Sequence, residues 1–163
     1  MLMTRDDAIR FIQNHQPMPL NPSNSLIDQY LSAIDVLKSD HSEESLLLRL
    51  RSLGFGLGVY DSVLDGVMSC ENHATLIRAI GTALDASNDT NLYWAILAAW
   101  EAPDDSYLMA LEKALSSKDA GVRSAAVTAL EKLGDAGRSV IRAHVSSELD
   151  PDVYAEMKEA LGE

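Results

Sequence analysis

Apolar residues recur at spacings of three and four along almost the whole chain, and the alternation typical of a half-buried strand is almost absent. This pattern predicts an all-α protein without a sheet. Residues that stop or cap helices divide the pattern into ten predicted helices. Their expected ranges are 4–14, 25–38, 42–54, 58–69, 73–86, 89–102, 105–117, 120–133, 136–147 and 151–161.

The first two predicted helices differ from the rest. Thr4 is expected to cap the first helix, and Asp6 and Asp7 follow it in the first turn, where the helix dipole favours acids. A connector with three prolines comes next, at residues 16–23, because proline disfavours helix at itself and at the residue before it. Residues 1–38 align with no repeat, so we expect an N-terminal helical cap there.

From residue 42 onward, the second helix of each predicted pair aligns with the second helix of the next pair. The opening apolar residues of these helices lie 30 to 33 residues apart, at Val59, Leu92, Val122 and Val153. The column seven residues further on contains only small residues: Gly66, Ala99, Ala129 and Ala160. Larger side chains there would push neighbouring helices apart, so this column predicts close helix packing. Stacked pairs of this kind jointly bury faces that one pair cannot bury alone.

Two further columns set the expected orientation of these helices. The column eight residues after the opening position is expected in the core, and it contains Val67, Trp100, Leu130 and Leu161. The columns two, six and nine residues after that position are expected to be exposed. Ala98 lies in the column six residues after the opening position, so it is expected to be exposed.

The C-terminal repeats carry a family resemblance. Residues 119–134, DAGVRSAAVTALEKLG, closely resemble the second helix of a HEAT repeat, and residues 150–162, DPDVYAEMKEALG, resemble it again. Weaker similarity extends this resemblance over residues 42–162. It implies a right-handed α-solenoid of about four HEAT-like helix pairs behind the N-terminal cap, forming one domain over residues 1–163.

The earlier repeats resemble a narrower group. The segments NLYWA at 91–95 and GFGLGVYD at 54–61 look like small bacterial HEAT-like proteins, which include immunity proteins encoded beside polymorphic toxins. One departure concerns the position after the opening apolar residue, which is usually arginine in HEAT repeats. Here it is occupied by Tyr60, Tyr93, Arg123 and Tyr154.

The charge balance narrows the range of partners. The chain has 25 acidic residues against 13 Lys and Arg, a net charge of −12. Nucleic-acid binding needs an excess of cations to neutralise phosphates, so we expect none. The same charge favours a basic partner, although acids also simply keep a small helical protein in solution.

The remaining composition predicts a reduced, cytoplasmic protein, and we expect it to be monomeric when free. Cys70 is the only cysteine, no apolar run is long enough to span a membrane, and residues 1–10 show no secretory signal.

Residues typical of catalysis or metal binding do not form a recognisable pattern. None of the four histidines pairs with another at helical spacing, which argues against a metal site; they are His15, His41, His73 and His144. The glycines at 54, 56 and 58 do not complete a dinucleotide motif, because Val59 stands where its third glycine is needed. We therefore expect no enzyme activity, cofactor or metal.

A partner site is expected on the second helices, because the resemblance to HEAT repeats implies that these helices line the concave face of the solenoid. Their exposed columns place aromatic residues beside acids, as in many protein interface hot spots. The expected partner-binding residues are Tyr60, Asp61, Asp65, Tyr93, Trp94, Glu101 and Glu131. In the alternative interpretation, which we prefer for Tyr154, the tyrosines pack between repeats and the acids are only solvated.

Two functions from different classes remain open. The first is a non-enzymatic bacterial immunity protein that binds and neutralises a basic toxin domain, such as a nuclease. The alternative is an accessory subunit or enzyme of the HEAT-like lyase type, acting on a cofactor-bearing protein. Both follow from fold-level resemblance rather than from a catalytic pattern.

Overall fold

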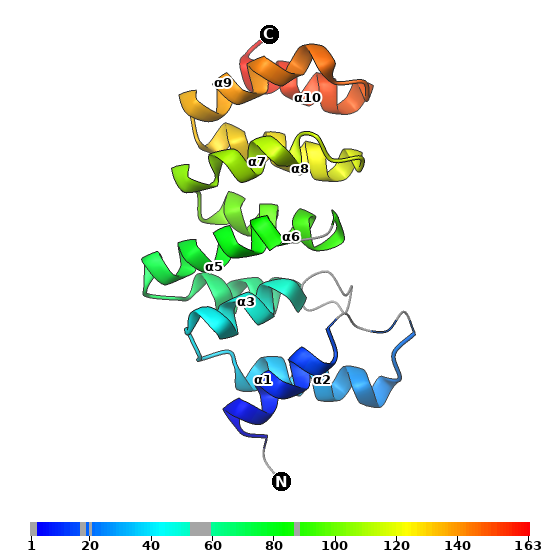
Figure 1. The fold of residues 1–163 in the computed structure, drawn as a ribbon, viewed down its shortest axis with the longest axis vertical. Helices are drawn as coiled ribbons and strands as arrows, with labels where there is room; N and C mark the ends of the chain where they lie inside the picture. The colour runs from blue at the N-terminus through cyan, green and yellow to red at the C-terminus, as the bar shows by residue number, and fades with distance from the viewer. Residues whose placement is uncertain (1–2, 17–18, 20, 53–59, 87–88) are drawn as a thin grey trace. The chain divides into compact units, whose positions relative to one another are not determined.

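The computed structural model describes residues 3–16, 19, 21–52, 60–86 and 89–163, with side chains except at 60–62, 86 and 89–90. This part of the chain contains helices and no strand, which confirms the predicted all-α class (Figure 1). The elements are α1 (Arg5–Asn14), α2 (Asn24–Val36), α3 (Glu43–Ser52), α4 (Tyr60–Met68), α5 (His73–Ala86), α6 (Asp89–Glu101), η2 (Asp105–Tyr107), α7 (Leu108–Ala114), α8 (Ala120–Lys132), α9 (Asp135–His144), η3 (Val145–Ser147) and α10 (Pro151–Leu161).

Each of the ten predicted helices corresponds to one of these helices, and the caps explain where several of them begin. The Thr4 hydroxyl accepts a hydrogen bond from the Asp7 backbone N–H at 3.2 Å, and the Asp7 carboxylate accepts one from the Thr4 N–H. Asp119 and Asp150 cap α8 and α10 in the same way, through one carboxylate oxygen each. A side-chain acceptor at this position satisfies N–H groups that the helix itself leaves unpaired.

The contacts divide the chain into two compact units, residues 1–79 and 80–163, with the boundary inside α5. In the first unit, α1 packs on α2 and α3, and α3 packs on α4. A polar cluster anchors the connector after α1: the Gln16 amide donates to the Tyr30 hydroxyl at 3.0 Å and to the Leu48 carbonyl at 3.0 Å. Tyr30 is fully buried, and this burial raises the pKa of its hydroxyl.

The first unit also encloses a cation. Arg49 is only 1% exposed, and its guanidinium donates to the backbone carbonyls of Lys38 and Asp40. Burial in this environment lowers the pKa of Arg49. Two backbone carbonyls therefore hold this arginine between α3 and the turn before it.

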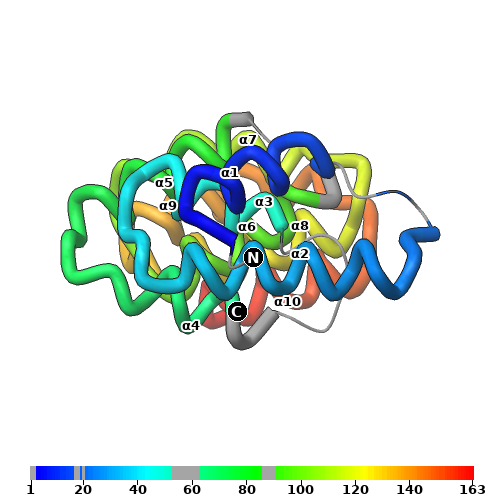
Figure 2. Tube along the Cα trace, turned by 90° about the horizontal axis from the view of Figure 1, so that it is seen from below, coloured from blue at the N-terminus to red at the C-terminus, as the bar shows by residue number. Residues whose placement is uncertain are grey.

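The second unit consists of stacked helix pairs. Helix α8 lies at its centre and packs against α6 and α10 on either side, while α7 packs on α8 and α9 on α10 (Figure 1). In Figure 2, which is seen from below, the helices of this unit overlap. The predicted small-residue column is buried here, with Ala99 at 2%, Ala129 at 1% and Ala160 at 9% exposure. This stacking is typical of α-helical repeat proteins, in which each pair contacts only its neighbours.

The second unit contains a very close helix contact that the second-helix columns did not reveal. A Cβ atom added at Gly137 of α9 would lie 1.8 Å from the backbone carbonyl oxygen of Leu130 in α8. Only glycine allows so close an approach of one helix to the backbone of another. The columns missed Gly137 because it lies on a first helix.

Two orientations on α6 differ from the prediction. Ala98 was expected to be exposed, but it is fully buried, because α6 also buries Ala95, Ile96 and Ala99 and so has a wider buried stripe than the columns indicated. Trp100 was expected in the core but is only half-buried. Large indoles are rarely enclosed completely, and this one borders a groove instead.

Candidate functional site

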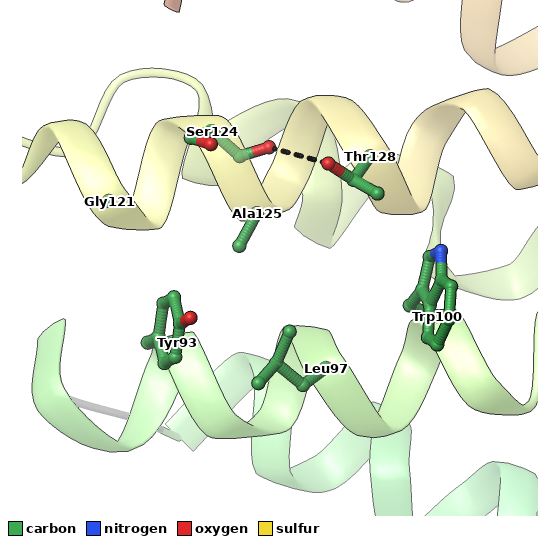
Figure 3. A pocket seen from close by; sticks show the side chains of 7 residues that line it. All are labelled: Tyr93, Leu97, Trp100, Gly121, Ser124, Ala125 and Thr128. Atoms are coloured by element: carbon green, nitrogen blue, oxygen red, sulfur yellow. Dashed lines mark hydrogen bonds between the residues drawn. The ribbon is translucent and has the colours of Figure 1, made fainter.

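A groove of about 340 Å³ lies between α6 and α8 (Figure 3). We call it the α6–α8 groove, and it is lined by Tyr93, Leu97 and Trp100 of α6 and by Gly121, Ser124, Ala125 and Thr128 of α8. Figure 3 shows the rings of Tyr93 and Trp100 reaching toward α8 from the two ends of the groove, with Leu97 between them. The Ala125 side chain points into the gap from the opposite helix.

Helical spacing explains why this groove exists. Tyr93, Leu97 and Trp100 lie at i, i+4 and i+7, so they share one face of α6. At 1.5 Å per residue, the two aromatic positions are about 10 Å apart along the helix axis. The α8 residues lie at i, i+3, i+4 and i+7 and are all small. Large side chains on one helix opposite small ones on the next leave the space unfilled.

None of the seven described residues that line the groove is charged, but a cation lies at its Trp100 end. The Lys132 ammonium lies 4.8 Å from the centroid of the Trp100 ring, a cation–π contact. Glu101 and Glu131, the sequence neighbours of Trp100 and Lys132, are exposed. The hydroxyls of Ser124 and Thr128 add polar groups to the α8 wall, and the Thr128 hydroxyl donates to the Ser124 carbonyl at 3.2 Å.

The expected partner-binding residues fall in both units. Tyr93 lines the groove. The ring of Trp94 lies edge-on to the ring of Tyr93, and the centroids of the two rings are 5.3 Å apart. In the first unit, Asp65 is exposed on α4. Tyr60 and Asp61 begin α4, but their side chains lie outside the described part, as do the glycines at 54, 56 and 58. The partner role of all these residues, and of Glu101 and Glu131, stays a prediction.

Sequence reasoning did not select Trp100, Ser124 or Thr128 for this site. Trp100 was assigned to the core because it shares a column with Leu130, which is fully buried. Ser124 and Thr128 fall in predicted exposed columns, yet a single small hydroxyl residue gives no signal of its own. The informative signal is a pair of aromatic residues two turns apart on one second helix, facing a run of small residues on the next.

Arg123 occupies the position after the opening apolar residue of its second helix, and it does not line the groove. Arg123 forms a bidentate pair with Glu148, with both N–O distances at 2.9 Å, and donates to the Ser117 carbonyl. The carboxylate of Glu148 also accepts backbone N–H bonds from Leu149 and Asp150. Hydrogen bonding to Arg123 is the main cause that lowers the pKa of Glu148. Arg123 therefore ties the start of α8 to the connection before α10.

The corresponding tyrosine of the last repeat is not part of such a contact. Tyr154 is 43% exposed on α10, so the expectation that it packs between repeats is wrong. The exposure follows from its place on α10, whose buried residues are Val153, Met157 and Ala160.

Among the described residues, no group of three or more His, Cys, Asp or Glu side chains is placed to hold a metal ion. None of the described helices is both long and apolar enough to cross a membrane.

Stacked helix pairs with capped second helices define the second unit as an α-helical repeat structure. Comparison with protein families matches residues 77–162 to HEAT repeats, which is more than half of the chain. The chain belongs to the HEAT-repeat family, and this confirms the resemblance from residue 77 onward. No curated protein and no solved structure matches it. HEAT repeats generally mediate contacts between proteins, so the family indicates a protein-binding helical module.

Proposed function

We propose that this chain is a non-enzymatic binding module that recognises a basic protein domain through the exposed face of its second helices. The α6–α8 groove carries this proposal, because it combines two aromatic walls with the exposed Glu101 and Glu131, which lie one helical turn beyond the lining residues Leu97 and Thr128. Aromatic side chains in a pocket are typical anchors of protein interfaces, whereas charges at the rim steer association. The net charge of −12 means that the chain as a whole also attracts a basic partner.

The biological role that we propose is that of a bacterial immunity protein for a basic toxin domain, such as a nuclease. A domain that acts on nucleic acid must attract phosphates, so its working surface is positively charged. An acidic helical module is complementary to that surface and competes with nucleic acid for it. Support comes from the charge and from the resemblance of residues 54–61 and 91–95 to small HEAT-like proteins of this kind.

The first experiment identifies the partner by affinity purification from the cells that make this protein. We expect a basic polypeptide whose retention decreases as salt increases, because exposed charges are screened over about 8 Å at physiological ionic strength. This polypeptide, expressed in a bacterial host, should arrest growth, and co-expression of the chain should restore it. An acidic or neutral partner would contradict the basic-partner proposal, and a basic partner without toxicity would contradict only the immunity role.

The second experiment tests the acids at the groove. Reversing Glu101 and Glu131 to lysine should slow association with the captured partner by about ten-fold at low salt, and less at high salt. The matched control reverses Glu71 and Glu112, which are exposed outside the second helices. Both double variants change the net charge equally, so an equal loss of rate would point to the overall charge and not to this face.

A further inference from the structure

We infer that the α6–α8 groove takes one uncharged, apolar side chain of the partner, and that lysine or arginine residues flank this anchor on the partner. This inference deepens the proposed function and rests on it. It assigns to the groove a chemistry that the family alone does not define.

The lining of the groove favours an apolar occupant. Its walls are the rings of Tyr93 and Trp100, its base is Leu97, and Ala125 faces them from α8 (Figure 3). The volume of about 340 Å³ is at the lower end of the range for small-molecule sites, roughly 300–1,000 Å³. A space of this size is large enough for any single apolar side chain.

The cation at one end argues against an arginine or lysine as the occupant. Lys132 already lies over the Trp100 ring at 4.8 Å, so a second cation beside that ring would be repelled. Partner cations are attracted instead to Glu101 and Glu131, which are exposed beside this cation–π pair in the sequence. The geometry therefore separates two roles: the groove holds the apolar anchor, and the acids outside it contact the flanking cations.

The test is a selection from a library of random peptides, with the chain as the immobilised target. Peptides that bind the chain are then compared on two variants. Thr128→Leu fills the groove from its exposed rim, and Thr82→Leu adds the same leucine at an exposed position of α5 that does not line this groove. We expect binders that lose about 30-fold in affinity on Thr128→Leu and are unchanged on Thr82→Leu.

The selected peptides themselves report the chemistry. Alanine scanning should find one large apolar residue whose removal costs about as much as filling the groove, with lysine or arginine residues nearby. Replacing this anchor by arginine should abolish binding to the chain, and Lys132→Met should restore part of it, because the repelling cation is then gone. This restoration is a readout that general damage to the peptide would not produce.

The outcomes separate the inference from the proposed function. Basic peptides that bind equally well to Thr128→Leu would overturn the inference and leave the basic-partner proposal standing. Binders that use the groove but carry no cations would contradict the basic partner instead. An arginine anchor that binds the chain as well as the apolar one, or a selection with no groove-dependent binder, would also overturn the inference.

Discussion

Helix α8 packs very closely against α9 on one side and leaves a groove toward α6 on another. Toward α9, the helix backbones meet so closely that Gly137 has no room for a Cβ atom beside the Leu130 carbonyl. Toward α6, aromatic residues stand opposite small ones and leave a groove of about 340 Å³. The repeat therefore keeps one contact of α8 tightly filled and leaves another open, and we interpret the filled side as the support and the open side as the binding surface.

The strongest way to break the filled side is Gly137→Ala. The added methyl group would meet the Leu130 carbonyl, and overpacking of this kind costs about 3 kcal/mol of unfolding free energy. The matched control is Gly81→Ala in α5, where the new Cβ makes ordinary contact with the Tyr107 ring at 3.8 Å. Alanine is otherwise the better helix former, so Gly81→Ala should be neutral or stabilising. Chemical denaturation of both variants checks this, and equal stabilities would contradict the close approach.

A second prediction compares two neighbouring positions of α8. Ala129 is 1% exposed in the small-residue column, so Ala129→Leu should cost about 2 kcal/mol. Thr128→Leu, one residue earlier, projects into the open groove and should change stability by less than about 0.5 kcal/mol. Thermal unfolding of the two variants measures the difference. A tolerated leucine at Ala129 would mean that the column is misplaced.

A third prediction concerns pH and the Arg123–Glu148 pair. The pKa of Glu148 is lowered in the folded state, so its contribution is fully present above the ordinary glutamate pKa and is lost as pH falls through the lowered value. Glu148→Gln should therefore cost about 1.5 kcal/mol at pH 7, and the difference from the unsubstituted chain should shrink by about pH 3. Denaturation at the two pH values checks this. Exposed Glu156→Gln is the control, and a cost at Glu148 that does not depend on pH would exclude the ion pair as its cause.

A fourth prediction concerns Lys132, beside the open side, and its expected loss is smaller than those at Gly137, Ala129 and Glu148. Lys132→Met removes the cation over Trp100, an interaction worth about 0.5–1 kcal/mol at an exposed site. Denaturation should detect a loss no larger than this. Lys118→Met, at an exposed lysine before α8, is the comparison and should be neutral. A loss well above that range would show that Lys132 supports the fold and is not only a neighbour of the groove.

The sequence predicted the fold more completely than the site, for a physical reason. Helix periodicity and caps are local, so the Thr4 cap and the presence of the ten helices could be read from the chain itself. The Gly137 contact and the Trp100 wall depend on which helices become neighbours, and neither residue differs locally from many others. Tyr93 could be predicted as a site residue because aromatic and acidic residues share its face. Ser124 and Thr128 belong to the site only because the lining residues of α6 lie opposite them.

The most direct test of the binding surface is backbone and indole NMR of the labelled chain, with and without the basic polypeptide captured from its own cells. We predict that the largest shifts fall on the residues of the α6–α8 groove, including the Trp100 indole N–H, and that α7 and α9 change little. Shifts concentrated on α7 and α9, with the Trp100 resonance unmoved, would contradict it and place the interface on the first helices.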